Sequence, residues 1–586
     1  MRFRKRIIKK LSVWALVLLF TLTFSVHVNA DTVNPQNTTK NAMVAAADPR
    51  ASHAGLEMLL KGGNAMDAAV ATAFALGVVE PNASGLGGGG FLLYYDAETE
   101  EVTVLDYREV APKAAEPDMY EDSDLPEDAQ TAGILSTGIP GQVAGLIGGL
   151  EKLGTLDRET VMQPAIDYAE DGIVVSEQLS GIIEDNRDNF LKYESAARDI
   201  YLKDGVNPYE PGDVLKQKEL AETLKEVAEK GEEGFYKGRV ADAIVDFMEE
   251  KDGLITHEDL EWYMENRPRE LEPVKGDYKG YNIYSMPPPS SGGIHIVQML
   301  NILENFDLEE DPDHPDNLHL LTEIQKLAFA DRAKYLGDTD FVDAPLEGLM
   351  SEEYAAELAE RIDMDQPMLE PEAGNPFEYQ EGSRDEFEDQ FAYTDQENEE
   401  SISTTHFSII DEEGNMVAAT NTINYFFGSK LVNPEIGVKL NNELADFTPV
   451  AGEPNSPEPL KSPLSSMSPT LIEDPEGRPF MTVGTPGATR IFPVVKQVFV
   501  NMVDYDMDIQ EAIERPRVYS SGVEMHAEGR FPYSLIKQME ERGHAVEMHD
   551  DWAPFFGATQ GIYIDYDNDN LVGGADPRRA GRAIGY

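Results

Sequence analysis

The chain has 586 residues, of which 109 are acidic and 47 are basic, so its formal net charge at pH 7 is −62. Such an excess of negative charge argues against nucleic-acid binding, and its self-repulsion predicts a fold that needs salt to screen it. The sequence contains no cysteine, which excludes disulfides and thiol nucleophiles. We therefore expect an acidic globular protein from a halophilic or salt-tolerant source.

The first 30 residues have the pattern of a secretory signal peptide. Six basic residues lie within residues 2–10, an apolar stretch runs from Leu11 to Val26, and Val28-Asn29-Ala30 is a small-residue cleavage site. Cleavage after Ala30 would take the formal net charge from −62 to −68. No later run is long and apolar enough to span a bilayer, so we expect a secreted chain, periplasmic if the source has an outer membrane.

Hydrophobic periodicity predicts an α/β chain. An alanine-rich helix from Ala65 to Val79 is followed by strands near residues 91–106, a helical region from about 145 to 265 and a helix near 317–337. Length alone would suggest roughly three to four domains, but no linker rich in Pro, Gly and Ser separates a second core. We therefore expect one globular α/β unit.

The run from Gly85 to Gly90 satisfies the G-x-G-x-x-G pattern of a dinucleotide site, but the elements around it are in the wrong order. A nucleotide loop follows a strand and opens a helix. Here a helix precedes the glycines and the strand Phe91 to Tyr95 follows them. The run therefore indicates a flexible backbone near an active site, and no nucleotide cofactor.

An acidic, structure-poor tract ends at a pair of threonines. From Glu370 to Glu400 most residues are Asp, Glu, Gln, Gly and Pro, so we expect this tract to be mobile. After it, residues 405–410 and 416–420 have the pattern of two strands, joined by a loop that contains glycine. A peptide bond before Thr404 would thus lie where a mobile segment enters a rigid sheet edge.

Cleavage before Thr404 would turn this residue into an N-terminal nucleophile. Its hydroxyl would attack a carbonyl carbon, and its own α-amine, with an ordinary pKa of about 7.7–8.0, would act as the general base. Branching at Cβ limits the hydroxyl to few directions. Because a threonine pair is more often only the start of a strand, this assignment depends on the surrounding sequence.

Metal sites are not predicted. The pattern Asp565-x-Asp567-x-Asp569 resembles the start of a calcium loop, but position six is Asn570, and a turn between two short strands explains it. The ten histidines include no H-E-x-x-H motif and no tight pair. His406 is expected to point from its strand without binding a metal.

Long blocks of sequence follow one another in the order known from one enzyme family. The earlier blocks are GGNAMDAA (62–69), SGLGGGGF (84–91), DYREVAP (106–112) and AFADR (328–332). The later blocks are TTHFS (404–408), TIN (422–424), FG (427–428), LNNELADF (440–447), KSPLSSMSPT (461–470), GTPGATR (484–490) and GADPRR (574–579). Together they cover almost the whole chain after residue 40, and they resemble the γ-glutamyltranspeptidase family.

This resemblance implies an N-terminal-nucleophile hydrolase with an αββα four-layer sandwich, made as a precursor that cuts itself between Ser403 and Thr404. A large subunit, 31–403, ending in the acidic tract 370–403, would remain bound to a small catalytic subunit, 404–586. By the same resemblance Thr404 is the nucleophile, Thr422 hydrogen-bonds its hydroxyl, and backbone N–H groups at Gly487 and Ala488 bind the oxyanion. The residues implied to hold the glutamyl donor are Arg108, Asn424, Glu443, Asp446, Ser465 and Ser466. The resemblance implies no cofactor and no metal.

The implied donor site is chemically reasonable. Arg108 offers a planar fork to the α-carboxylate of a γ-linked glutamyl group, while Asp446 and Glu443 face its α-ammonium. Two residues depart from the family. Ala488 replaces the usual second glycine and would be strained at a positive φ, and Glu443 replaces a glutamine of some relatives, which adds a negative charge.

Only residues 448–460 separate the blocks that end at Phe447 and begin at Lys461. This segment is too short for the lid that covers the site in some family members, so we expect an open cleft that admits bulky acceptors. The expected activity is γ-glutamyl transfer from glutathione or glutamine to water, amino acids or peptides. One alternative is a poly-γ-glutamate depolymerase or a side-chain-amide acylase with the same machinery. The other is a polyanionic secreted binding protein that is never cut.

Overall fold

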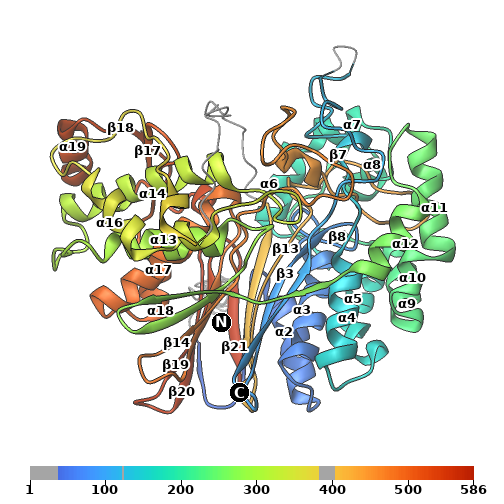
Figure 1. Ribbon diagram of the computed structural model, residues 1–586. Helices are drawn as coiled ribbons and strands as arrows, with labels where there is room; N and C mark the ends of the chain where they lie inside the picture. The colour runs from blue at the N-terminus through green and yellow to red at the C-terminus, as the bar shows by residue number, and fades with distance from the viewer. Residues whose placement is uncertain (1–36, 122–124, 382–402) are drawn as a thin grey trace, which may run out of the picture. The chain divides into compact units, whose positions relative to one another are not determined.

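Two seven-stranded antiparallel sheets lie at the centre of the structure, a computed structural model that describes residues 37–121, 125–381 and 403–586 (Figure 1). The first sheet has the order β21 (Arg582–Gly585), β2 (Met43–Ala46), β12 (Thr405–Ile410), β13 (Met416–Thr422), β3 (Gly89–Asp96), β4 (Glu101–Tyr107), β9 (Arg269–Leu271). The second has the order β1 (Asn37–Thr39), β20 (Asn570–Ala575), β19 (Gln560–Asp565), β15 (Pro479–Gly484), β14 (Thr470–Glu473), β11 (Tyr281–Ser285), β10 (Val274–Tyr278).

The two sheets pack face to face through apolar side chains. This inner core includes Met43, Phe91, Ile410, Leu471 and Ile562, all 6% exposed or less. Every residue of β12 and β13 is buried, because helices cover the other face of their sheet. Polar residues of these strands, such as His406 and Ser408, are therefore buried as well.

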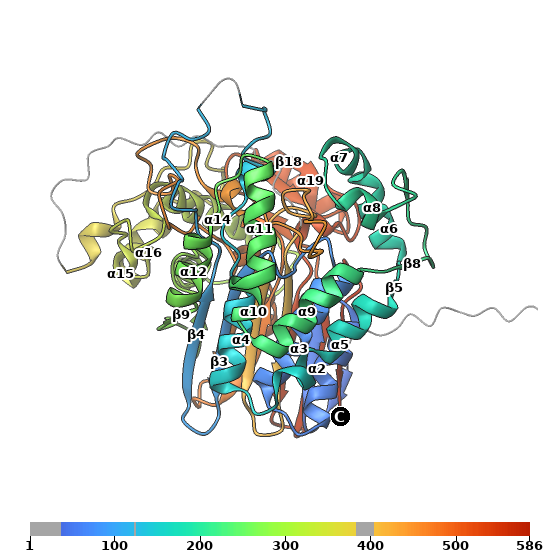
Figure 2. The ribbon, with the colours of Figure 1, turned by 90° about the vertical axis from the view of Figure 1, so that its right-hand side faces the viewer.

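One helical layer covers the outer face of the first sheet, on the right of Figure 1 and toward the viewer in Figure 2. Its innermost helix, α3 (Ala65–Val79), is wholly buried and starts with a capping box formed by Asn64 and Asp67. Its small alanine side chains let the helix pack closely on β12 and β13. The other helices of this part of the chain are α2 (Pro49–Leu60), α4 (Gln142–Leu153), α5 (Arg158–Asp171), α6 (Glu177–Asp185), α7 (Arg187–Lys192), α8 (Ala197–Tyr201), α9 (Lys218–Lys230), α10 (Glu233–Tyr236), α11 (Gly238–Glu250) and α12 (His257–Asn266).

A second helical layer covers the outer face of the second sheet. It contains α13 (Gly292–Leu303), α17 (Ile491–Tyr505) and α18 (Ile509–Glu514), with α14 (Pro315–Tyr335), α15 (Leu346–Leu349) and α16 (Glu352–Glu360) packed onto them. A small sheet of β16 (Val518–Tyr519), β17 (Glu524–Ala527) and β18 (Ala545–Met548) carries α19 (Tyr533–Arg542). Two two-stranded ribbons, β5 (Ile173–Val174) with β8 (Val214–Leu215) and β6 (Leu202–Lys203) with β7 (Asn207–Pro208), complete the strands. The layers are therefore helix, sheet, sheet and helix.

The predicted elements are confirmed. The helix 65–79 has the predicted bounds, the helix near 317–337 is α14, and the hairpin after Thr404 is β12 and β13. The helical region near 145–265 is α4 to α12, interrupted only by the short ribbons. The acidic pattern near 565–569 is the turn between β19 and β20, where Asn568 N–H donates to Asp565 Oδ1. All described residues belong to one compact unit, Gln36–Tyr586.

Two predictions need correction. The acidic tract is anchored at its beginning, because Phe377 is 4% exposed and its ring packs on Tyr335. The rest of the tract, 382–402, lies outside the described residues, as does the predicted signal peptide. The strand that Thr404 enters is not at a sheet edge: β12 lies between β2 and β13. Phe407 to Ile410 pair with both neighbouring strands, whereas Thr405 and His406 pair with β13 alone.

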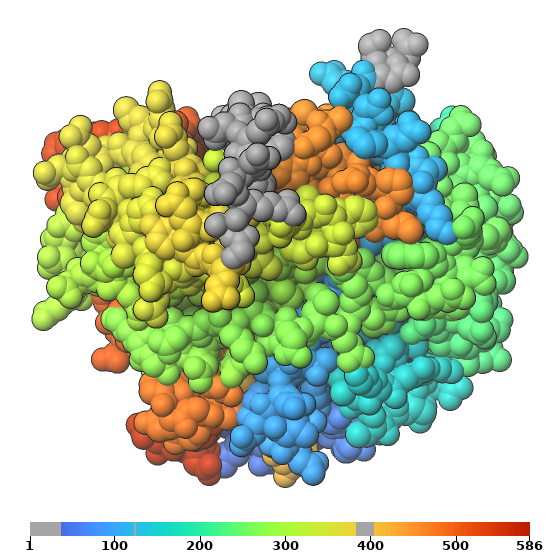
Figure 3. All heavy atoms as spheres, in the orientation of Figure 1, coloured from blue at the N-terminus to red at the C-terminus, as the bar shows by residue number. Residues whose placement is uncertain are grey.

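The segment between Phe447 and Lys461 reaches the surface on the face shown in Figure 3, orange beside blue. Phe447 and Leu444, just before it, pack with Ala111 and Ala115 from the earlier part of the chain. Within the ranges that the structure describes, no helix is both long and apolar enough to cross a bilayer.

Candidate active site

Thr404 lies at the start of the central strand β12 and is 7% exposed. Its hydroxyl oxygen is 2.9 Å from the hydroxyl of Thr422, which ends the neighbouring strand β13. Thr422 Oγ1 also accepts a hydrogen bond of 2.8 Å from the backbone N–H of Asn424. The structure therefore brings together the two threonines that the sequence pairs, and fixes the direction of the Thr404 hydroxyl.

Three residues of this region have a backbone conformation that L-residues rarely adopt. The φ angle is +74° at Thr404, +68° at Asn424 and +52° at Ala488. For the β-branched Thr404 a positive φ is a clear outlier. Residues held in such conformations cost about 1–3 kcal/mol each and gather at functional sites.

Charged side chains form a buried group next to the threonines, here called the acidic cluster and defined as Arg108, Glu109, Glu443 and Asp446. Arg108 is 1% exposed and pairs with Glu443 through Nη1 and with Asp446 through Nη2, the latter at 2.5 Å. Asn424 Nδ2 donates to Asp446 Oδ1 at 2.9 Å. The fork of Arg108 is thus engaged by the two carboxylates that were predicted to face a substrate ammonium.

The acidic cluster has one guanidinium and three carboxyl groups. Burial, opposed by Arg108, raises the pKa of Glu109 to about 7. Burial and the neighbouring Glu109 and Asp446 also raise the pKa of Glu443 far above its ordinary value, against the attraction of Arg108. Two interacting acids of this kind titrate as a pair. Burial therefore favours a proton on this pair of acids, which lowers the negative charge of the cluster.

The two predicted serines lie on the segment that follows Lys461. This segment reaches the acidic cluster because Arg108 Nε donates to the carbonyl of Pro463 at 3.3 Å. The hydroxyl of Ser466 accepts a hydrogen bond of 3.2 Å from Arg332 Nη2, and the carbonyl of Ser465 accepts a hydrogen bond from the Ser291 hydroxyl. Arg332 and Ser291, which sequence reasoning gave no role, thus hold this segment from the second helical layer.

Gly487 and Ala488 follow β15, whose last residue is Gly484. A Cβ atom on Gly484 would lie 2.3 Å from the ring of His406, two residues after Thr404. The turn that carries Gly487 and Ala488 therefore leaves its sheet at the Thr404 end. Ala488 has φ +52°, so the condition under which we expected strain is met.

His406 points from β12 into the space between the sheets. Its ring hydrogen-bonds Thr420 at 2.8 Å and Ser408 at 3.2 Å. Burial lowers the pKa of His406 to about 3, so the ring is neutral and serves the packing of the sandwich.

The glycine run 85–90 acts through close packing. Helix α3 precedes it and β3 follows it, as predicted. A Cβ atom on Gly88 would lie 2.0 Å from the carbonyl oxygen of Thr422, and one on Gly87 would lie 1.8 Å from that of Lys439. These glycines let the chain approach the strand end that carries Thr422, so close approach and not flexibility is their role.

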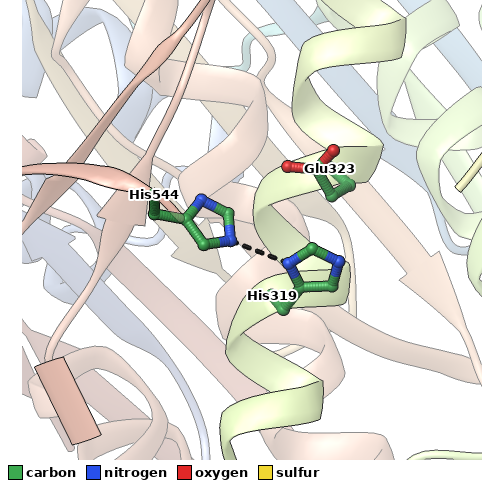
Figure 4. A group of neighbouring side chains, drawn as sticks. All are labelled: His319, Glu323 and His544. Atoms are coloured by element: carbon green, nitrogen blue, oxygen red, sulfur yellow. Dashed lines mark hydrogen bonds between the residues drawn. The ribbon is translucent and has the colours of Figure 1, made fainter. Parts of the chain in front are cut away.

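Outside this region, His319 and Glu323 on α14 face His544, which follows α19 (Figure 4). The His319 Nδ1 and His544 Nε2 atoms are 2.7 Å apart, and His319 Nε2 lies 3.0 Å from the carbonyl of Asp363. Because that carbonyl can only accept, His544 donates to His319. Glu323 pairs with the Lys326 ammonium at 2.8 Å.

These contacts give each of the three side chains a hydrogen-bond or ion-pair partner within the protein, while His544 Nδ1 has none. Two imidazole nitrogens on one tetrahedral zinc ion would be roughly 3.3 Å apart. A metal would therefore have to separate the two rings and displace Lys326 from Glu323. We assign this group a structural role. Sequence inspection could not find it, because His544 joins α14 only through the tertiary fold.

Comparison with known proteins agrees with this architecture. The family model described as gamma-glutamyltranspeptidase matches residues 51–586. The chain is 40% identical over 553 residues to a glutathione hydrolase proenzyme of Bacillus subtilis, covering 93% of this chain and 92% of the relative. It is 38% identical over 571 residues to the glutathione hydrolase proenzyme of Escherichia coli, covering 94% and 93%.

Among solved structures, the cephalosporin acylase of Bacillus halodurans superposes with a TM-score of 0.83 at 28% identity, covering 94% of this chain and 97% of that one. The αββα sandwich built around the Thr404 strand is thus the N-terminal-nucleophile hydrolase fold. The chain therefore belongs to the γ-glutamyltranspeptidase family of enzymes.

Proposed function

We propose that this protein is a secreted γ-glutamyltransferase and glutathione hydrolase that cuts its own chain before Thr404. One observation supports this most strongly: a continuous line of hydrogen bonds joins the Thr404 hydroxyl to the acidic cluster. It passes from Thr404 to Thr422, to the backbone of Asn424, and from the Asn424 side chain to Asp446. Nucleophile and donor site are thus parts of one rigid unit.

In the proposed reaction the Thr404 hydroxyl attacks the γ-carbonyl carbon of the donor while its proton passes to the α-amine of the same residue. Backbone N–H groups at Gly487 and Ala488 would stabilise the oxyanion, an effect worth about 2.7–4 kcal/mol per donor in acyl-transfer enzymes. Loss of the amine leaving group gives a threonyl ester. Water or the amine of an acceptor then attacks this ester and releases the glutamyl product.

Donor binding would exchange partners within the acidic cluster. Arg108 would release Asp446, whose side chain is 29% exposed, and the freed Nη2 would bind the α-carboxylate of the donor. Asp446 would then face the α-ammonium. Asp446 and Glu443 can pair with the α-ammonium of a zwitterionic γ-glutamyl head group, a contact that a group without the ammonium cannot make.

The assay that tests this function measures γ-glutamyl-p-nitroanilide turnover, with and without glycylglycine as acceptor. The wild-type protein should release nitroaniline, and the acceptor should accelerate the release. Thr404→Ala should show no turnover, and Thr404→Ser should retain part of it, because serine keeps the hydroxyl and the α-amine. Turnover by the alanine variant at the wild-type rate would reject the assignment.

A second activity, acylase action on another side-chain amide, is favoured by the fold likeness to a cephalosporin acylase. It requires turnover of an acyl group without the free α-amine that Asp446 and Glu443 are proposed to face. Glutaryl-p-nitroanilide differs from the γ-glutamyl compound only by lacking the α-amine. A kcat/KM for the glutaryl substrate equal to or above that for the γ-glutamyl one would favour the acylase.

The short segment 448–460 supports an open cleft that admits large substrates, poly-γ-glutamate included. Turnover of glutathione compared with poly-γ-glutamate of defined length tests this point. If no substrate larger than a tripeptide is processed, the open cleft is rejected.

Secretion and salt tolerance are proposed from the basic and apolar N-terminal segment and from the net charge of −62. The thermal unfolding midpoint should rise as salt is added, because salt screens repulsion between carboxylates. Equal midpoints at low and high salt would reject the halophilic origin. Detection of the processed protein only inside the cell would reject secretion.

A further inference from the structure

Arg579 lies against the peptide bond that the proposed self-cleavage would break. It follows β20 in the turn before β21 and is 7% exposed. Its Nη2 atom donates to the carbonyl oxygen of Ser403 at 3.3 Å, and its Nη1 atom donates to the carbonyl oxygen of Thr404 at 2.7 Å. One guanidinium therefore contacts the carbonyls on both sides of Thr404.

The loop after α3 fixes both partners of this contact. Glu80, the residue that ends α3, accepts a hydrogen bond from Arg579 Nη1 at 3.1 Å. Ser403 Oγ donates to the carbonyl of Asn82 at 3.1 Å. The guanidinium and the Ser403 peptide are thus tied to the same loop, which limits their relative movement.

The peptide at this point is also under strain. Thr404 has φ +74° in the uncut chain, while Thr422 holds its hydroxyl at 2.9 Å. A β-branched residue in this conformation stores roughly 1–3 kcal/mol. Cutting the bond before Thr404 removes the constraint on φ, so this strain favours cleavage.

We propose that Arg579 is the oxyanion-stabilising residue of self-cleavage, an inference that rests on the proposed function. The Thr404 hydroxyl oxygen attacks the carbonyl carbon of Ser403, and negative charge develops on the Ser403 oxygen that Arg579 contacts. The bond from the Ser403 carbon to the Thr404 nitrogen then breaks, and the proton lost by the hydroxyl ends on that nitrogen. Water hydrolyses the resulting ester, which yields the Ser403 carboxylate and the free Thr404 hydroxyl.

Maturation and turnover would then use different oxyanion donors. During maturation the acyl group belongs to Ser403, and its oxygen faces Arg579. During turnover the acyl group belongs to the donor substrate, and the backbone at Gly487 and Ala488 is its proposed donor pair. Self-cleavage happens once in each molecule and acts on one fixed peptide bond. Its oxyanion donor therefore needs no selectivity between substrates, and a cation is suitable.

The test follows the first-order disappearance of the full-length precursor by mass spectrometry for wild type, Arg579→Met, Arg579→Lys and Arg582→Met. Loss of one oxyanion donor slows acyl transfer by about 10²–10³-fold, which we expect for Arg579→Met. Arg579→Lys should be intermediate, because it keeps the charge without the fork. Arg582→Met removes the same charge from the neighbouring strand β21 and should cleave at the wild-type rate.

Cleavage of a folded Arg579→Met variant within twofold of wild type overturns the inference while leaving the proposed function intact. A wild-type chain that stays whole, or is cut elsewhere, overturns both. If the Arg579 variants do not fold, the crystal structure of the uncut Thr404→Ala protein decides. A contact between Arg579 and the Ser403 oxygen within about 3.5 Å supports the inference, and a separation beyond about 5 Å rejects it.

Discussion

The acidic cluster near Thr404 and a second buried group of charges differ in charge balance, although in both most of the charged side chains are buried. The second group, here called the balanced cluster, consists of Arg517, Glu528, Asp576 and Arg578, each 4% exposed or less. It has two guanidinium and two carboxylate groups, joined by contacts of 2.6–3.0 Å. The acidic cluster has one guanidinium for three carboxyl groups.

The difference in charge balance between the two clusters appears in the pKa values of their carboxyl groups. Although burial opposes ionisation, Arg517 and Arg578 hold the pKa of Asp576 below its ordinary value. In the acidic cluster, burial overcomes the effect of Arg108 and raises the pKa of Glu109 and Glu443. A buried ion pair with its partners present stabilises the charged forms, whereas an excess of one sign is costly and marks a site that receives a charge from outside. From this comparison we propose a structural role for the balanced cluster and donor binding for the acidic cluster.

The largest expected effect comes from breaking the balanced cluster. Asp576→Ala leaves Arg517 and Arg578 without their shared carboxylate, and removal of one partner from a buried pair costs about 3–5 kcal/mol. Denaturant unfolding should show a loss of this size. An unfolding midpoint equal to that of wild type would contradict the structural role of the balanced cluster.

A smaller effect, on donor binding and not on stability, is expected for a substitution in the acidic cluster. Asp446→Asn keeps the shape of the side chain but removes the charge that would face the donor ammonium. The KM for γ-glutamyl donors should rise about 10–100-fold, because a hydrogen bond to a charged group contributes about 1.5–3 kcal/mol. The unfolding midpoint should change far less than in Asp576→Ala. An unchanged KM would contradict the binding role.

The pH dependence of folding stability should also differ between the two clusters. Because the pKa of Glu109 is raised to about 7 in the fold, the folded chain keeps a proton that the unfolded chain releases near pH 4.3. This contribution to stability is fully present below about pH 4 and is lost as the pH rises through about 7.

Over the same rise in pH the acidic cluster becomes more negative, so its affinity for an ammonium should increase. From pH 6 to 8 the dissociation constant of a non-reactive γ-glutamyl analogue should fall about tenfold, the equivalent of one pKa unit. Calorimetric titration of wild type and Glu109→Gln checks this. A wild-type affinity that is as flat with pH as that of the variant would contradict the shared proton.

The smallest expected effect concerns backbone strain at the proposed oxyanion site. Ala488 has φ +52°, a conformation that glycine adopts without penalty. Ala488→Gly should raise the free energy of unfolding by about 0.5–1 kcal/mol, since the relief of strain is partly offset by chain entropy. A stability lower than wild type would show that Ala488 is not strained.

Sequence reasoning predicted the structural features that depend on local sequence pattern. Alternation and glycine placement predicted the hairpin that carries Thr404 and Thr422, and ordered motifs brought in Arg108, Glu443 and Asp446. It included Arg579 in the block 574–579 without giving it a role and missed its contact with Glu80, because that contact joins residues 499 positions apart. It also missed the paired titration of Glu109 with Glu443, since burial and distance, not residue type, set these pKa values.

The central claim is that Thr404 becomes the first residue of a new chain. Intact-mass measurement and N-terminal sequencing of the purified active protein test it most directly, with Thr404→Ala as the uncut control. We expect two fragments in equal amount, the smaller one beginning at Thr404 and ending at Tyr586. A fully active protein that is uncut, or whose smaller fragment begins at any other residue, would contradict the account.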